Sequence, residues 1–170
     1  MGADADLNDV GVLRRREIEA RILSPVVEAL AREFGRERVL EVVRRVVTAI
    51  AEAQGRQLAQ ARGASDLATL AAALEPWTRD GALEIRTLRH TDRELHFDVT
   101  RCRYAEMYRA LGIPDLGTVL SCNRDFALGG GFNPRLRLRR TRTIMEGASH
   151  CDFRFTLDAA PATPTDGSAP

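Results

Sequence analysis

The 170-residue sequence contains no lysine, so all 25 of its basic side chains are arginine, and Schiff-base chemistry on lysine is excluded. The 24 acidic residues nearly cancel the arginines, and a net charge of +1 argues against nucleic acid or a membrane surface as a partner. No apolar run reaches the ~18 residues that a membrane span needs. The acidic start, Met1–Asp6, lacks an apolar signal core. We therefore expect a cytoplasmic protein that does not bind a membrane.

Cysteine is also scarce: the chain has Cys102, Cys122 and Cys151, separated by 19 and 28 residues. An odd number of cysteines without a close pair predicts free thiols in a reducing compartment. No Cys-x-x-Cys or His-x-x-x-His pair is present, and His150 and Cys151, adjacent on a predicted strand, point to opposite faces. We expect no cofactor, with zinc held by the three cysteines through tertiary contacts as the alternative.

The N-terminal third is predicted to be helical. Apolar residues recur at every fourth position from Ile18 to Phe34, so one helix is expected over 14–34, with a kink or a new start at Ser24-Pro25. A second helix is predicted over 36–61, and Ser65-Asp66 caps a short third one. Valines and one isoleucine at helical spacing predict a buried stripe on the second helix: Val39, Val43, either Val46 or Val47, and Ile50. These helices are a candidate surface for forming a homo-oligomer.

The rest of the chain predicts a sheet with helices inserted into it. Alternating apolar residues predict a β-hairpin over 83–99, and helices are expected over 104–111 and 116–128. A second hairpin is predicted to pair 135–145 with 151–157. The expected fold class is therefore α+β, with N-terminal helices and a four-stranded antiparallel sheet made of two hairpins that flank two helices.

One domain is expected over 14–158, since a chain of this length buries a sizeable core. A flexible N-terminus, 1–13, and a disordered tail, 159–170, rich in alanine, proline, threonine and serine, are predicted to flank it. Gly129-Gly130-Gly131 is expected to be a hinge or a helix cap. It is not a phosphate-binding loop, because the preceding strand and the following Gly-Lys-Ser/Thr are missing.

Polar side chains and thiols are concentrated between 120 and 154. Asn123, Arg124 and Asp125 follow Cys122 within one helical turn, where the arginine can lower the thiol pKa and the carboxylate can move protons. Cys122 is therefore the leading candidate nucleophile, and the alternative is a small buried apolar side chain.

Cys102 begins a predicted helix, with Glu106 one turn further on, and a helix N-terminus favours the thiolate. An ordinary capping role is the alternative. The arginines of 135–142 alternate with apolar residues, which predicts the solvent face of a strand rather than a nucleic-acid site. One of them is a candidate for holding a substrate carboxylate.

Several motifs of residues 101–154 also occur together in a known family. They read Arg101-Cys102-Arg103-Tyr104-Ala105-Glu106-Met107-Tyr108, Leu111-Gly112, Leu116-Gly117, Ser121-Cys122-Asn123-Arg124-Asp125, Asn133-Pro134, Arg140-Thr141, Thr143-Ile144-Met145-Glu146-Gly147 and Cys151-Asp152-Phe153-Arg154. In these motifs the chain resembles the L-2-amino-thiazoline-4-carboxylic acid hydrolase family, over roughly residues 14–158.

The resemblance implies a hydrolase that opens a small sulfur- and nitrogen-containing ring to an N-carbamoyl cysteine, on a route to cysteine. Cys122 would attack the ring carbon, and water would release the product. The implied catalytic residues are Cys122, Asp125, Cys102, Cys151, Asp152 and Glu106. The implied substrate contacts are Arg101, Arg124 or Arg154 to the carboxylate, with Asn123 and Asn133. A metal on the three thiols is the rival mechanism, and a non-catalytic small-molecule or thiol-sensing module is the alternative function.

Overall fold

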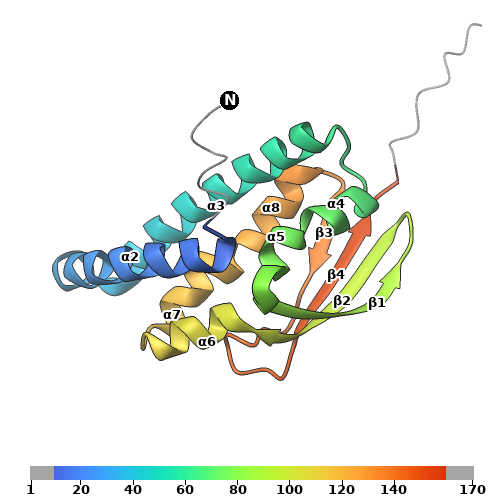
Figure 1. Cartoon of the computed structure of the whole chain (residues 1–170). Helices are drawn as coiled ribbons and strands as arrows, with labels where there is room; N and C mark the ends of the chain where they lie inside the picture. Colours follow the sequence, from blue (N-terminus) through green and yellow to red (C-terminus); the bar gives the residue numbers. More distant parts are fainter. Residues whose placement is uncertain (1–9, 160–170) are drawn as a thin grey trace, which may run out of the picture.

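A helical hairpin forms the N-terminal third of the computed structural model, which describes residues 10–159 (Figure 1). Its helices are α2, Val12–Phe34, and α3, Arg36–Arg62. Gly35 joins them with a φ of +86°, a conformation that glycine adopts without strain. Helix α2 continues through Pro25, so the predicted new start at this proline is wrong. The predicted flexible and disordered ends fall mainly on residues 1–9 and 160–170, which lie outside the described residues.

Short helices lead from the hairpin to the sheet: α4, Leu67–Ala73, α5, Glu75–Thr78, and the 3₁₀ turn η1, Arg79–Gly81. The predicted cap of the first is confirmed, because Asp66 accepts a hydrogen bond of 2.7 Å from the backbone N–H of Thr69.

The sheet has the order β1-β2-β4-β3, and all its neighbouring strands are antiparallel. Its strands are β1, Leu83–His90, β2, Glu94–Cys102, β3, Leu136–Arg139, and β4, Cys151–Leu157. The predicted α+β class with a four-stranded antiparallel sheet is thus confirmed. Strand β3 is much shorter than the predicted 135–145, because the Asp152 carboxylate accepts the backbone N–H groups of Thr141 and Arg142 and so removes both donors from the ladder.

The chain between the hairpins forms α6, Arg103–Ala110, α7, Pro114–Gly117, the π-turn η2, Thr118–Cys122, and α8, Arg124–Phe132. The single helix predicted over 116–128 is therefore interrupted. The three glycines 129–131 lie inside α8, so their prediction as a hinge or cap is wrong. Gly131 lets α8 pack directly on α3, because a Cβ atom there would collide with the backbone of Glu52.

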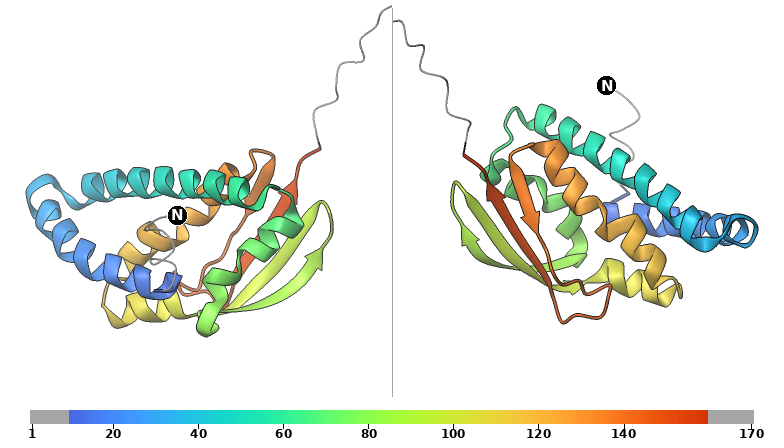
Figure 2. Two further views of the ribbon diagram at one scale, coloured as in Figure 1. Left: turned by 45° about the horizontal axis from the view of Figure 1, so that its top comes forward. Right: turned by 180° about the vertical axis from the view of Figure 1, so that it is seen from behind.

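The helices cover one face of the sheet, as the two views of Figure 2 show. Inward side chains of β2, β3 and β4 contribute to the core, and Phe97 and Phe153 stack there with ring centroids 4.9 Å apart. On α3, Val39 and Val47 are buried as predicted. Val46, the alternative to Val47, is 53% exposed, and Ile50 is 46% exposed, so the prediction is wrong for Ile50. Within residues 10–159, the helices are too short or too polar to cross a bilayer.

Candidate functional site

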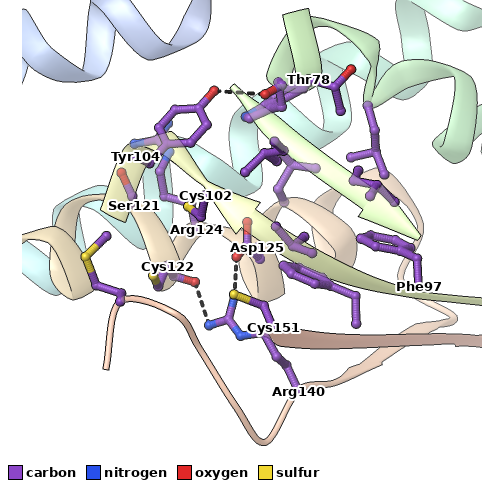
Figure 3. A pocket seen from close by; sticks show the side chains of 18 of the residues that line it. Thr78, Phe97, Cys102, Tyr104, Ser121, Cys122, Arg124, Asp125, Arg140 and Cys151 are labelled. Carbon is purple, nitrogen blue, oxygen red and sulfur yellow. Dashed lines mark hydrogen bonds and ion pairs between the residues drawn. The ribbon is translucent and has the colours of Figure 1, made fainter. Parts of the chain in front are cut away.

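All three cysteines line one cavity of about 120 Å³ between the sheet and the helices (Figure 3). Cys102 reaches it from the end of β2, Cys151 from the start of β4, and Cys122 from the end of the π-turn η2. Most of the wall is apolar and includes Phe97, Val99, Trp77 and Phe153. The cavity thus has the usual character of a small-molecule site, an apolar lining with a few polar groups that converge on it.

The π-turn places Cys122 at the wall of this cavity. Its wide loop is closed by a hydrogen bond of 3.1 Å from the Asn123 backbone N–H to the Thr118 carbonyl, five residues earlier. Turns of this kind are rare and are frequent at functional sites. Ser121 beside the thiol also lines the cavity, and its hydroxyl is held by a 3.1 Å hydrogen bond with the Tyr108 hydroxyl.

Arg140 ties the thiol segment to the carboxyl group of Asp125. Its guanidinium donates to the Asp125 carboxylate and, over 3.1 Å, to the Cys122 carbonyl (Figure 3). The rings of Phe126 and Phe153 lie 5.1 and 5.2 Å from the same guanidinium carbon, and its side chain is only 6% exposed. The alternation in 135–142 predicts a solvent face for most of its arginines and does not distinguish Arg140, although Arg140-Thr141 is one of the family motifs.

Burial raises the pKa of Asp125, and the attraction of Arg140 offsets this only in part. Its side chain still has 35% of its surface accessible, and it lines the cavity. A carboxyl group with a raised pKa is a stronger proton acceptor than an ordinary aspartate, so Asp125 is suited to exchange a proton with a group bound in the cavity.

The surroundings of the three thiols favour their protonated form. Burial raises the pKa of Cys122, and the nearby Asp125 raises it further. Burial also raises the pKa of Cys151, and it raises that of Cys102 to about 11. Cys102 is the N-cap of α6 and accepts a hydrogen bond of 3.4 Å from the Ala105 backbone, yet this favourable contact is weaker than the cost of burial. The expected thiolate at this helix end is therefore not favoured.

Arg124 is a buried cation at the cavity without a carboxylate partner. Its guanidinium donates to the neutral Gln54 side chain over 2.5 Å, and among residues 10–159 no acidic group lies within 4.0 Å of it. Its neighbour Arg16 also lines the cavity but is neutralised by Glu19 at 2.5 Å. Burial and the charge of Arg16 lower the pKa of Arg124 to about 10, so a bound anion would relieve an unfavourable state.

The other predicted site residues do not line the cavity. Glu106 and Arg101 form an exposed ion pair of 2.8 Å with each other. Arg154 pairs with Asp98 at 2.7 Å, and Asn133 donates to the Ser65 carbonyl over 2.8 Å, which joins α8 to the start of α4. The amide nitrogen of Asn123 is buried without a hydrogen-bond partner in the described part of the chain.

Asp152 follows Cys151 on β4, so it points to the other side of the sheet from the thiol and holds the loop after β3. Besides the two backbone N–H groups, its carboxylate accepts the Thr141 hydroxyl at 2.7 Å. Partial burial acts to raise the pKa of Asp152, but these hydrogen bonds outweigh it and lower the value to about 2. The contacts indicate that Asp152 fixes the backbone that carries Arg140.

We expect Asp152→Asn to lower the free energy of unfolding by about 1–2 kcal/mol at pH 7, since charge-assisted hydrogen bonds are lost. The pKa of Asp152 is lower in the folded protein than in the unfolded chain, so its ionised carboxylate stabilises the fold at a pH above the unfolded-state pKa. This contribution disappears as the pH falls through about 2. Urea titrations at pH 7 and near pH 2 should therefore show a difference from the wild type that is lost in acid. An equal difference at both pH values would contradict this role.

The described residues contain no group of three or more histidine, cysteine, aspartate or glutamate side chains arranged to hold a metal ion. Cys102 and Cys151 reach the cavity from the paired strands β2 and β4, and Cys122 reaches it from the π-turn η2. The zinc alternative therefore has no preformed set of ligands between residues 10 and 159.

Comparisons with known proteins agree with the fold and the motifs. The family model described as L-2-amino-thiazoline-4-carboxylic acid hydrolase matches residues 15–155. No curated protein is similar enough to match the chain. Among solved structures, the phenol-responsive sensory domain of the transcription activator PoxR, crystallised with phenol, is similar at a TM-score of 0.52 and 11% identity, over 80% of this chain and 73% of that one. This second likeness shows a shared fold.

Proposed function

Because the chain belongs to the L-2-amino-thiazoline-4-carboxylic acid hydrolase family, we propose that it hydrolyses a small ring containing sulfur and nitrogen in the cavity lined by Cys122. L-2-Amino-thiazoline-4-carboxylate is the substrate that we expect, with N-carbamoyl cysteine as the product. The three free thiols suit a reducing compartment such as the cytoplasm.

One observation carries this proposal: a thiol, a carboxyl group with a raised pKa and a buried arginine without a carboxylate partner line the same small cavity. An apolar cavity of about 150 Å³ holds a benzene molecule. The volume here, about 120 Å³, therefore suits a single five-membered ring with small substituents. The apolar wall would face the ring atoms, and the polar groups would meet its amidine and carboxylate ends.

The proposed first step is attack by the Cys122 sulfur on the ring carbon between nitrogen and sulfur, while Asp125 accepts the thiol proton. The ring carbon–sulfur bond breaks, and the departing sulfur takes the proton from Asp125. A water molecule then attacks the same carbon and expels the Cys122 thiol. The balance is addition of one water to the ring, which leaves a carbamoyl group on nitrogen and a free thiol on the product. Arg140 would hold Asp125 and the Cys122 backbone in place during both steps.

Arg124 is the residue that we assign to the substrate carboxylate. We expect Arg124→Gln to raise KM by roughly 10- to 100-fold with a much smaller change in kcat, because a charge-assisted hydrogen bond contributes about 1.5–3 kcal/mol. Steady-state kinetics of the two proteins measure this split. Arg101→Gln is the matched control, since Arg101 is exposed and paired outside the cavity. If both variants have the same KM as the wild type, the carboxylate is bound elsewhere.

A binding or sensing module is the second candidate function. Two observations favour it: burial raises the pKa of all three thiols, and the cavity wall is mostly apolar. The fold is shared with a sensory domain that responds to a small aromatic molecule. In this alternative the ring would bind intact, and Asp125 and Arg124 would only position it.

Turnover separates the two candidates. The purified protein is incubated with a panel of thiazoline and related cyclic amidine acids, and the products are read by mass spectrometry. A product heavier than its substrate by one water supports the hydrolase. Saturable binding of the same compounds, detected by calorimetry, together with their recovery unchanged, would support the binding module instead.

A further inference from the structure

Two rows of large apolar side chains are exposed on the helical hairpin. On α2, the row has a spacing of four residues and exposed fractions of 48, 61, 48, 40 and 54%, for Ile18, Ile22, Val26, Leu30 and Phe34. On α3, a shorter row with the same spacing is 45, 53 and 46% exposed, for Val42, Val46 and Ile50. We call these eight residues the hairpin rows. They make up most of the exposed large apolar residues of the described chain.

The hairpin rows lie on two helices whose connection projects from the rest of the molecule. Figures 1 and 2 show α2 and α3 extending away from the sheet, with their connection at Gly35 at the far end. Only one residue joins the two helices, so their adjoining ends lie close together. The sheet lies at the opposite end of the molecule from Gly35.

The apolar area that the hairpin rows expose is similar in size to the area that one partner buries in a stable interface. A fully accessible large apolar residue has roughly 200 Å² of surface, so half-exposed hairpin rows present on the order of 750 Å², close to the ~800 Å² per partner of a standard stable interface. Monomeric proteins rarely expose apolar patches larger than about 300–600 Å². Removing apolar surface of this extent from water lowers the free energy, so its burial favours association.

We propose that the hairpin rows of two copies of this chain pack against each other around a two-fold axis. Rows with a spacing of four residues form ridges, and ridges of this kind from two helices interdigitate at a crossing angle of about −50°, the commonest packing of helices in globular proteins. In a two-fold interface each row meets a surface of the same composition, so apolar residues cover apolar residues on both sides.

The charges beside the rows fit a second copy better than a partner of one sign. Between residues 32 and 45, seven exposed charged residues have no ion-pair partner within 4.0 Å in the described chain: Arg32, Glu33, Glu37, Arg38, Glu41, Arg44 and Arg45. Three are acidic and four are basic. A two-fold axis can place the acidic residues of one copy beside the basic residues of the other, whereas an anionic membrane or an acidic protein would leave the glutamates facing like charge.

The test is the mass of the intact protein in solution across a concentration series, by sedimentation or light scattering. We expect a dimer for the wild type at micromolar concentration. Ile22→Glu combined with Val46→Glu should raise the dimer dissociation constant at least about 100-fold, because each substitution buries an unpaired charge twice in a two-fold interface. Leu88→Glu is the matched control, since Leu88 is 50% exposed on β1 outside the hairpin rows, and its dimer should be unchanged.

A wild-type monomer at 100-fold higher concentration overturns the proposal, and so does a dimer that persists in the folded double variant. Binding of the monomer to anionic vesicles, lost in the double variant, would assign the surface to a membrane instead. If circular dichroism shows that the glutamate variant is unfolded, Ile22→Ser with Val46→Ser is measured in its place. The result does not depend on the hydrolase proposal, because mass and not turnover is recorded.

Discussion

Replacing Cys122 with alanine is expected to lower kcat for opening of the thiazoline ring by about 10⁴-fold or more, the loss typical of a removed nucleophile. The reason is local: Arg140 links the Cys122 backbone carbonyl to the Asp125 carboxylate, and the Cys122 side chain lines the cavity. Serine at this position should be nearly as inactive, because a hydroxyl is a weaker nucleophile than a thiol. Both variants should still bind the substrate, since the carboxylate contact of Arg124 is unchanged.

Two control variants make this expectation specific. Cys102 and Cys151 line the same cavity, but their sulfur atoms accept backbone N–H groups, from Ala105 and Ile144. Their alanine variants should therefore lose much less activity than Cys122→Ala. Equal losses in all three would point to a shared role of the thiols, such as binding a soft metal ion. Unchanged turnover in Cys122→Ala would remove the covalent mechanism.

Gly131→Ala is expected to destabilise the protein by at least about 3 kcal/mol, in the range of overpacked cores, or to prevent folding. An added Cβ atom would overlap the carbonyl oxygen and carbon of Glu52 on α3. These are backbone atoms, so the clash cannot be relieved by a side-chain rotation, and α8 would have to separate from α3. Arg124 and Asp125 are carried by α8, so such a shift would also deform the cavity.

The neighbouring residue supplies the matched control. Gly130 is exposed, and a Cβ atom there meets no heavy atom within 4 Å. Gly130→Ala should leave stability unchanged or raise it by about 0.5–1 kcal/mol, because alanine is the better helix former. Urea unfolding of the two variants measures both effects. Equal stabilities for them would show that α3 and α8 are not in direct backbone contact.

The sheet was predictable because a strand with one buried face has apolar residues at every second position, as at Leu95, Phe97 and Val99. Which side of α3 is buried could not be predicted from the sequence. Valine at 46 and at 47 fits the helical period equally well, and only contact with α8, through Gly55 and Gly131, decides which side is covered. The glycines were assigned to a hinge because a close helix crossing leaves no other sign in a sequence.

At the site, the family motifs indicated Cys122, Arg124 and Asp125, and these three residues line one cavity. Successive side chains on a strand point to opposite faces, which separates His150 from Cys151. The same rule would have placed Asp152 away from the cavity. Nothing in the sequence indicated that Arg16 lines the cavity. It is the last of three consecutive arginines, and its position depends on how α2 packs. The burial of Arg140 was not predicted, because strand β3 ends at Arg139, one residue before it, whereas the predicted strand runs on to 145.

Mass spectrometry of the wild-type protein, acid-quenched during the first turnover of L-2-amino-thiazoline-4-carboxylate, tests the central claim most directly. We expect a fraction of the protein to be heavier by the whole mass of the substrate, with the addition located on the peptide that contains Cys122. Product formation without any such adduct, or an adduct on Cys102 or Cys151 alone, would contradict the proposed chemistry at Cys122.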